Sequence, residues 1–222
     1  MTVDSEVFEF LYELERNNNR EWFSLNKSRF DKIRKNVTDF VAQLILNINA
    51  FDSSIGSLDA RKTIFRIYRD TRFSKDKDPY KTNLGSVIVP EGYRKKWHYP
   101  AYYLHLQDNK SFISMGVYMP DSAPLKRIRC AIDENFETFK DILGKLESDF
   151  GTMLREEDML KRVPAGFDKN SPAAEYLKLK NFYLYKPFSN GEVLQKNFIE
   201  TITSLYEKCF PLKCWFTEAT EE

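Results

Sequence analysis

Cysteine and histidine are scarce in this chain. Its 222 residues include three cysteines and two histidines, and the cysteines (Cys130, Cys209 and Cys214) form no CxxC motif. An odd number of cysteines on a chain of this length is typical of reduced thiols rather than of a disulfide framework. With only His98 and His105, the sequence also lacks the ligand spacing of a recognisable zinc site.

Long apolar runs and catalytic signature motifs are absent as well. The longest uncharged run, residues 40–51, is too short to span a bilayer. Asp4 and Glu6 stand where a signal peptide would need a basic start and an apolar run. The chain has no GxSxG, GxGxxG or P-loop sequence, so we expect no cofactor. The sequence therefore predicts a cytoplasmic protein with no membrane partner.

Neither sign of charge dominates the chain. Lysine and arginine number 34 and the acidic residues 33, which leaves a net charge of +1. Such a balance gives no overall attraction to nucleic acid or to a membrane surface. A nucleic-acid partner is therefore possible only through a local patch.

Apolar spacing predicts the helices and strands. Helical periodicity runs through residues 7–14, 30–48, 125–143 and 193–205, and strand-like alternation through residues 63–69, 85–89, 101–107, 112–119 and 181–186. The clearest hairpin joins residues 101–107 to residues 112–119, and hairpin links favour antiparallel pairing. We therefore expect one α+β domain over residues 1–222, with a mostly antiparallel sheet and helices packed on it.

The most basic stretch is residues 61–81, which we call the basic segment. It holds eight basic and three acidic residues, a net charge of +5 in a chain whose total is +1. One interpretation is an anion site, because guanidinium groups suit phosphate and carboxylate oxygens. The other is that Asp70, Asp76 and Asp78 pair with these cations and only fix a loop. Its candidate ligand-binding residues are Arg66, Tyr68, Arg69, Arg72, Lys77 and Lys81.

Strand alternation adds Tyr103 and His105 to the candidate binding residues. Both face away from the apolar side of their predicted strand. If the strands share one sheet, Arg66, Tyr68 and Tyr118 lie on the same face, and Tyr183 and Tyr185 join them if the last strand is adjacent. Such a face could stack a base and bind a phosphate. Alternatively, helices cover it and the hydroxyls bond locally.

Proton transfer and metal binding have few candidates. Asp70 and His105 are the potential proton carriers of an enzyme, although Arg69 and Arg72 are obvious ion-pair partners for Asp70. Asp76 and Asp78 form a DxD pair with the oxygen ligands that Mg²⁺ prefers. Lys75 and Lys77 interleave with this pair and would repel a cation, so we predict no metal site.

Four stretches of the chain resemble a family of bacterial and fungal proteins called domain of unknown function 2461. They are residues 8–30, residues 65–83 with the signature FRIYRDTRFSKDKDPYKT, the strands YYLHLQ and SFISMGVYMP, and residues 160–184. The resemblance implies one domain throughout and brings no catalytic residue with it. Threonine is common in the family where Asp78 stands here, which further disfavours a metal role for the DxD pair.

These observations favour a binding module for a phosphate-bearing or other anionic small molecule. Its pocket would use the residues of the basic segment named above together with Tyr103 and His105. Two alternatives stay open. One is a hydrolase or nuclease acting on a phosphoester through Asp70 and His105, and the other is a scaffold whose basic segment meets an acidic protein surface.

Overall fold

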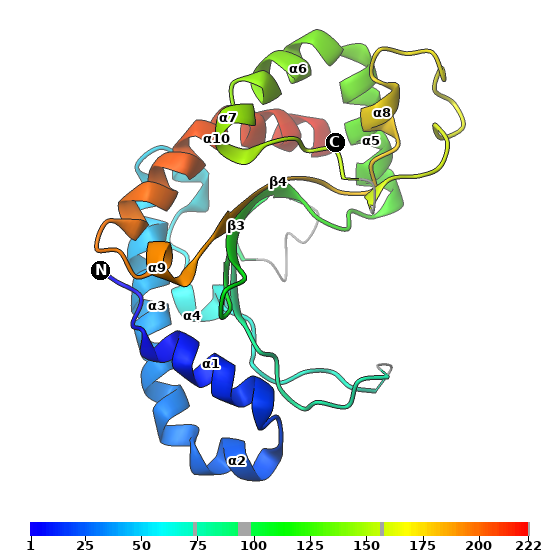
Figure 1. The fold of residues 1–222 in the computed structure, drawn as a ribbon. Helices are drawn as coiled ribbons and strands as arrows, with labels where there is room; N and C mark the ends of the chain where they lie inside the picture. Colours follow the sequence, from blue (N-terminus) through cyan, green and yellow to red (C-terminus); the bar gives the residue numbers. More distant parts are fainter. Residues whose placement is uncertain (73–74, 93–98, 156–157, 222) are drawn as a thin grey trace.

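The protein is described here by a computed structural model that covers residues 1–72, 75–92, 99–155 and 158–221 (Figure 1). The described elements, in chain order, are α1 (Glu6–Arg16), α2 (Arg20–Leu25), α3 (Lys27–Asn49), η1 (Ser53–Ile55), α4 (Ala60–Thr63), β1 (Leu84–Ile88), β2 (Ala101–Leu106), β3 (Ser111–Val117), α5 (Ser122–Glu134), α6 (Phe136–Gly144), α7 (Glu147–Phe150), α8 (Ala174–Leu177), β4 (Phe182–Phe188), α9 (Asn190–Val193) and α10 (Phe198–Thr220). None of the helices in these ranges combines the length and the apolarity needed to cross a bilayer.

The four strands form one antiparallel sheet in the order β1-β2-β3-β4. Each strand pairs with its neighbour in the sequence, and the predicted hairpin is present as β2 and β3. The α+β prediction is therefore confirmed. Residues 63–69, however, are not a strand of the sheet. They make only single bridges, one from Ile64 to Ser86 and one from Tyr68 to Tyr80.

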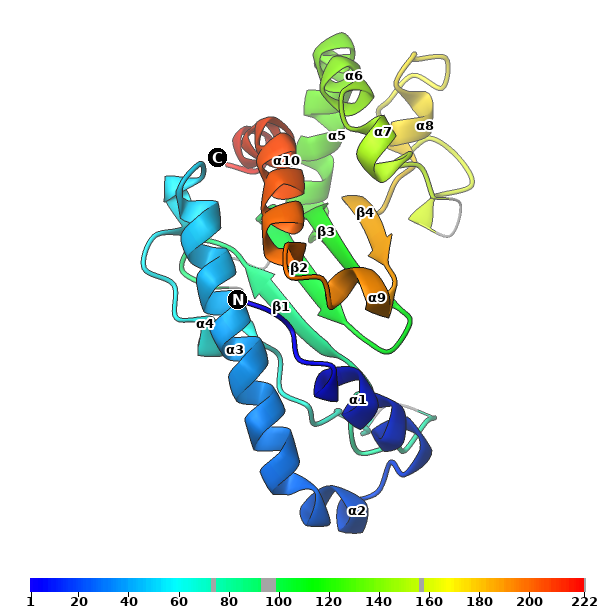
Figure 2. The same ribbon diagram turned by 60° about the vertical axis from the view of Figure 1, so that its left-hand side comes forward.

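One face of the sheet packs against helices. Tyr102, Leu104 and Leu106 of β2 point to that side and are buried, as are Ile113 and Met115 of β3. The two long helices α3 and α10 lie on this side of the sheet, and α10 contacts β3 directly (Figure 2). Strand alternation therefore sends the intervening side chains of β2 and β3 to the opposite face.

The C-terminal helices differ from the predicted single stretch over residues 193–205. A capping box formed by Ser189 and Glu192 starts the short helix α9, and α10 begins separately at Phe198. Helix α10 then continues past Pro211 to Thr220. Leu212 and Phe216, which follow the proline, are fully buried, so tertiary packing outweighs the cost of proline in a helix interior.

A buried ion pair joins α10 to the rest of the fold. The Lys213 ammonium lies 2.9 Å from Asp52 Oδ2, and their side chains are 5% and 2% exposed. Tyr102 of β2 donates a hydrogen bond to the same oxygen, and Ser54 of η1 donates one to Oδ1. Burial alone would raise the pKa of Asp52, but the bonds from Lys213, Ser54 and Tyr102 outweigh it and hold the pKa below its ordinary value.

The backbone of β3 adopts a conformation at Gly116 that would direct a side chain into the backbone of β4. Gly116 has a φ of 144°, and a Cβ atom there would lie 2.1 Å from the carbonyl oxygen of Phe182. Only glycine fits this position without moving backbone atoms. Strand pairing places Tyr183, the register partner of Gly116, beside the uncovered face of the sheet.

Candidate ligand-binding site

The face of the sheet opposite the helices forms a hollow of about 520 Å³, which we call the sheet cavity. In the described part of the chain, no helix lies over this face (Figure 1). Its volume falls within the usual range of small-molecule sites. The cavity is lined by Phe65, Val87, Tyr99, Ala101, Tyr103, His105, Phe112, Ser114, Gly116, Tyr118, Arg155, Tyr183 and Tyr185.

The strand register explains why this face is hollow. Tyr103 of β2 pairs with Ser114 of β3, which pairs with Tyr185 of β4. A small side chain on the central strand thus stands between two large rings. Gly116, the next residue of β3 on this face, has no side chain at all. The cavity therefore has a floor of small residues on β3 and aromatic walls on β2 and β4.

One wall carries a hydrogen-bonded chain along β2. The Tyr103 hydroxyl lies 2.9 Å from His105 Nδ1, and His105 Nε2 lies 3.0 Å from Gln107 Oε1. Because Gln107 Oε1 can only accept, His105 carries its proton on Nε2 and donates it to this oxygen. His105 Nδ1 then accepts the hydrogen bond from the Tyr103 hydroxyl. Gly85 makes room for the tyrosine, because a Cβ atom there would lie 2.5 Å from its hydroxyl.

The environment keeps both groups of this chain uncharged. Desolvation lowers the pKa of His105, the charge of Lys81 lowers it further, and the bond to Gln107 opposes both. Desolvation also raises the pKa of Tyr103 to about 12. At neutral pH the cavity therefore presents a neutral imidazole behind a protonated phenol.

The opposite wall carries the positive charge of Arg155. Its guanidinium carbon lies 4.7 Å from the ring centre of Tyr185 and 5.2 Å from that of Tyr183. The Arg155 Nε atom is buried and has no hydrogen-bond partner among the described residues. Within the same residues no carboxylate forms an ion pair with this arginine. Ring faces attract a cation, but they do not neutralise it.

Asp158, a nearby acid, is committed to other partners. Its Oδ2 accepts a hydrogen bond of 3.0 Å from the Tyr183 hydroxyl, and its Oδ1 accepts one of 2.8 Å from Asn181 Nδ2. Desolvation and this carboxylate raise the pKa of Tyr183 to about 12. Asp158 therefore holds the tyrosine in place beneath Arg155.

A second cation, Lys81, lies next to the cavity without lining it. The Lys81 ammonium sits 4.9 Å from the ring centre of Phe65, which lines the cavity beyond β1. Burial lowers the pKa of Lys81, and the neighbouring charge of Arg66 adds to this effect. Among the described residues, no acidic side chain pairs with Lys81.

Three other cations of the basic segment are bonded within it. Arg69 bonds Asp76 at 2.5 Å, and Arg72 bonds Asp70 through two nitrogens. The Lys77 ammonium donates to the Thr71 carbonyl at 3.0 Å. The bond from Arg72 lowers the pKa of Asp70 to about 2, and Asp70 lines neither of the two hollows described here. Such a carboxyl is a poor proton carrier at neutral pH.

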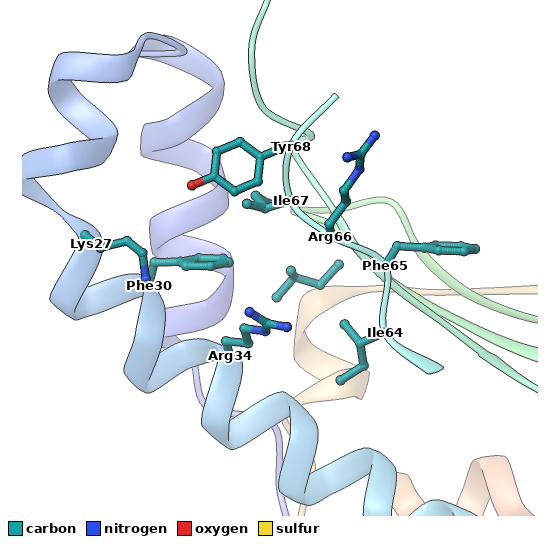
Figure 3. A pocket seen from close by; sticks show the side chains of 9 residues that line it. Lys27, Phe30, Arg34, Ile64, Phe65, Arg66, Ile67 and Tyr68 are labelled. Atoms are coloured by element: carbon teal, nitrogen blue, oxygen red, sulfur yellow. The ribbon is translucent and has the colours of Figure 1, made fainter. Parts of the chain in front are cut away.

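Arg66 and Tyr68 belong to a second, smaller hollow of about 70 Å³, between the segment 64–68 and α3. Lys27 and Arg34 also line it, and Lys27 is already paired with Asp31. Figure 3 shows the Arg66 guanidinium pointing away from Arg34 and Lys27. The cations that line this smaller hollow therefore do not converge on one point. Of the predicted binding residues, Tyr103 and His105 line the sheet cavity, Lys81 lies next to it, and Arg66 and Tyr68 line the smaller hollow instead.

The comparisons with known proteins identify a family and no function. The model of the family described as "Conserved hypothetical protein (DUF2461)" matches residues 6–215, nearly the whole chain. The chain belongs to the DUF2461 family. No curated protein and no solved structure matches it.

In this DUF2461 chain, sequence reasoning missed Arg155 and Asp158. Both lie in the irregular stretch between α7 and α8, where no periodicity indicates which way a side chain points. His98 lies outside the described residues. Among those that are described, no three His, Cys, Asp or Glu side chains gather as they would around a metal ion.

Proposed function

We propose that the protein is a non-covalent binding module for a small organic anion that carries a planar ring. The observation that carries the proposal is the charge of Arg155, which no carboxylate of the described residues pairs, in a cavity walled by aromatic rings. Holding a cation in a partly desolvated site without a counter-ion costs free energy, which an anionic ligand would recover. Stacking on tyrosine and phenylalanine rings would hold the planar part.

The proposal places the protein in the cytoplasm, as the sequence analysis expects. All three cysteines are free thiols, which suits a reducing compartment.

Thermal unfolding in the presence of paired ligands tests this function. Nucleoside monophosphates and planar aromatic carboxylates are compared with the same rings lacking the acidic group. A ligand at one hundred times its Kd stabilises the folded state by about 2.7 kcal/mol, a rise in Tm of roughly 5–10 °C for a chain of this size. The charged member of a pair is expected to raise Tm, and the uncharged member is not.

Three variants locate the binding. Arg155→Met keeps the apolar stem and should abolish the rise, whereas Arg34→Met, at the smaller hollow, should leave it intact. Ser114→Leu should fill the floor of the sheet cavity and also abolish the rise. A rise that survives both Arg155→Met and Ser114→Leu would exclude this site.

A second candidate function, phosphoester hydrolysis at the same site, is favoured by the Tyr103–His105 hydrogen bond. A neutral imidazole that accepts from a phenol can take up a proton during a reaction. Release of inorganic phosphate from aryl phosphates should then occur with the wild type and be lost in His105→Asn. Ligand-induced stabilisation without any phosphate release would leave the binding function alone.

A further inference from the structure

Two cations flank the sheet cavity: Arg155 lines it, and Lys81 lies next to it, against the lining residue Phe65. Arg155 stands over β4, on the rings of Tyr183 and Tyr185. Lys81 stands over Phe65, whose amide donates to the Gly85 carbonyl at the outer edge of β1. Lys81 therefore lies at the β1 side of the aromatic rings, within electrostatic reach of His105 on β2, and Arg155 lies at the β4 side.

The strand order gives an approximate distance between the two ends of this arrangement, Phe65 and Tyr185. From Phe65 to Tyr185 the path crosses β1, β2 and β3, and neighbouring strands lie about 4.8 Å apart. The span is therefore roughly 15–20 Å, allowing for the curvature of the sheet. One continuous cavity covers it, since both Phe65 and Arg155 line the same hollow.

Aromatic rings occupy the space between the two charges. The His105 ring stacks on Phe112 with centroids 4.5 Å apart, and Phe112 contacts Tyr185 at 4.7 Å. Tyr103 lies 5.6 Å from Phe112 and 6.4 Å from Phe65. A row of ring faces thus connects one cation to the other. A single planar ring with one acidic group would engage only part of it.

We propose that the ligand is a dinucleotide-like molecule, with two planar rings between anionic groups at its two ends. Arg155 binds one terminal anion and Lys81 the other, while the rings stack on the row between them. This inference rests on the proposed function, because it uses the same cavity and the same arginine. It adds Lys81 as the residue that selects for a second terminal charge.

Two probes of equal ring content test the inference. One is a dinucleotide with a phosphate at its 5′ end only, and the other carries phosphates at both its 5′ and 3′ ends. A charge-assisted contact strengthens binding by about tenfold or more, so calorimetry should find the doubly phosphorylated probe tighter by at least that factor. Lys81→Met should remove this preference. Lys75→Met, an exposed lysine of the same basic segment, should keep it.

Each result separates this inference from the proposed function. If both probes bind equally well and Arg155→Met weakens both, the proposed function stands and the role of Lys81 is wrong. A preference that survives Lys81→Met also overturns that role. If neither dinucleotide binds while a single-ring anion still raises Tm, the inference fails and the proposed function stands. If Arg155→Met changes no binding at all, both fail.

A longer oligonucleotide provides the last comparison. An eight-residue strand should bind no tighter than the doubly phosphorylated dinucleotide, because the cavity of about 520 Å³ has no room for a longer chain. Affinity that rises with each added nucleotide would overturn the inference. It would place the contacts outside the cavity, on the exposed cations of the basic segment.

Discussion

Single side chains decide what the sheet cavity offers a ligand. Tyr103 and His105 are held by each other and by Gln107, whereas within the described ranges the contacts of the Arg155 guanidinium are with ring faces. The first pair is therefore a satisfied polar unit, and the arginine is an unsatisfied one. An incoming anion gains most from the unsatisfied group, because no existing bond must be broken first.

The desolvated imidazole of His105 predicts a particular pH dependence of stability. Because the folded state favours neutral His105, the unfolded chain binds more protons below its ordinary pKa of about 6.5. The contribution of His105 should be complete above pH 6.5 and decline as the pH falls toward the lowered folded-state pKa. The quantity to measure is the free energy of unfolding of the wild type minus that of His105→Gln.

This difference should shrink between pH 7.5 and pH 5.5. All other titrating groups are common to both proteins, so they cancel. A difference that grows as the pH falls would mean that His105 is charged in the folded state.

At the scale of elements, α10 is held by both apolar and ionic contacts. Its buried Lys213 reaches across to Asp52 and Ser54, while Tyr206 donates to the Tyr103 carbonyl on β2. The helix thus ties the loop after α3 to the back of the strand that carries Tyr103 and His105. Displacing α10 would move a wall of the sheet cavity.

The Lys213–Asp52 pair predicts a large, non-additive loss of stability. Lys213→Met leaves a buried carboxylate without its counter-ion, which costs about 3–5 kcal/mol. The double variant Lys213→Met with Asp52→Asn should lose less than the two single losses combined, because neither charge remains. Urea unfolding of the four proteins in this cycle gives the coupling energy.

The same pair has a pH signature. Since the pKa of Asp52 is lowered in the folded state, its contribution is present above about pH 3.9 and is lost as the pH falls through the folded-state pKa. Strictly additive losses in the cycle would show that the two charges do not depend on each other.

The sequence predicted the helices and strands better than it predicted the residues of the sheet cavity. The alternation along residues 101–107 and 112–119 correctly placed Tyr103, His105 and Tyr118 on one face, because strand side chains alternate whatever the tertiary context. It failed for Arg66 and Tyr68, since residues 63–69 only bridge to β1 and to Tyr80. Arg155 could not be found at all, because its position depends on how an irregular segment packs over β4.

At the scale of the whole molecule, helices cover one face of the sheet, and the opposite face forms the cavity. The apolar core fills the space between the sheet and the helices α3 and α10 (Figure 2). Cys209 of α10 is fully buried in that core, whereas Cys130 and Cys214 are only partly buried. Burial also raises the pKa of the Cys209 thiol, which suppresses the reactive thiolate.

Thiol labelling should therefore report global opening. Under native conditions a maleimide should modify Cys130 and Cys214 first, and Cys209 only at the rate at which the whole core opens. Peptide mass spectrometry with and without urea measures the three rates. Labelling of Cys209 as fast as that of Cys214 in the absence of urea would show that α10 detaches without global unfolding.

The unequal freedom of two neighbouring positions on β3 has a practical consequence for redesign. Gly116 admits no side chain, because the carbonyl of Phe182 occupies the place of a Cβ atom. Ser114, two residues earlier, already carries a side chain on the cavity floor. A redesign of the cavity for a smaller ligand can therefore vary Ser114 but must keep Gly116. In a library randomised at both positions, most members would misfold.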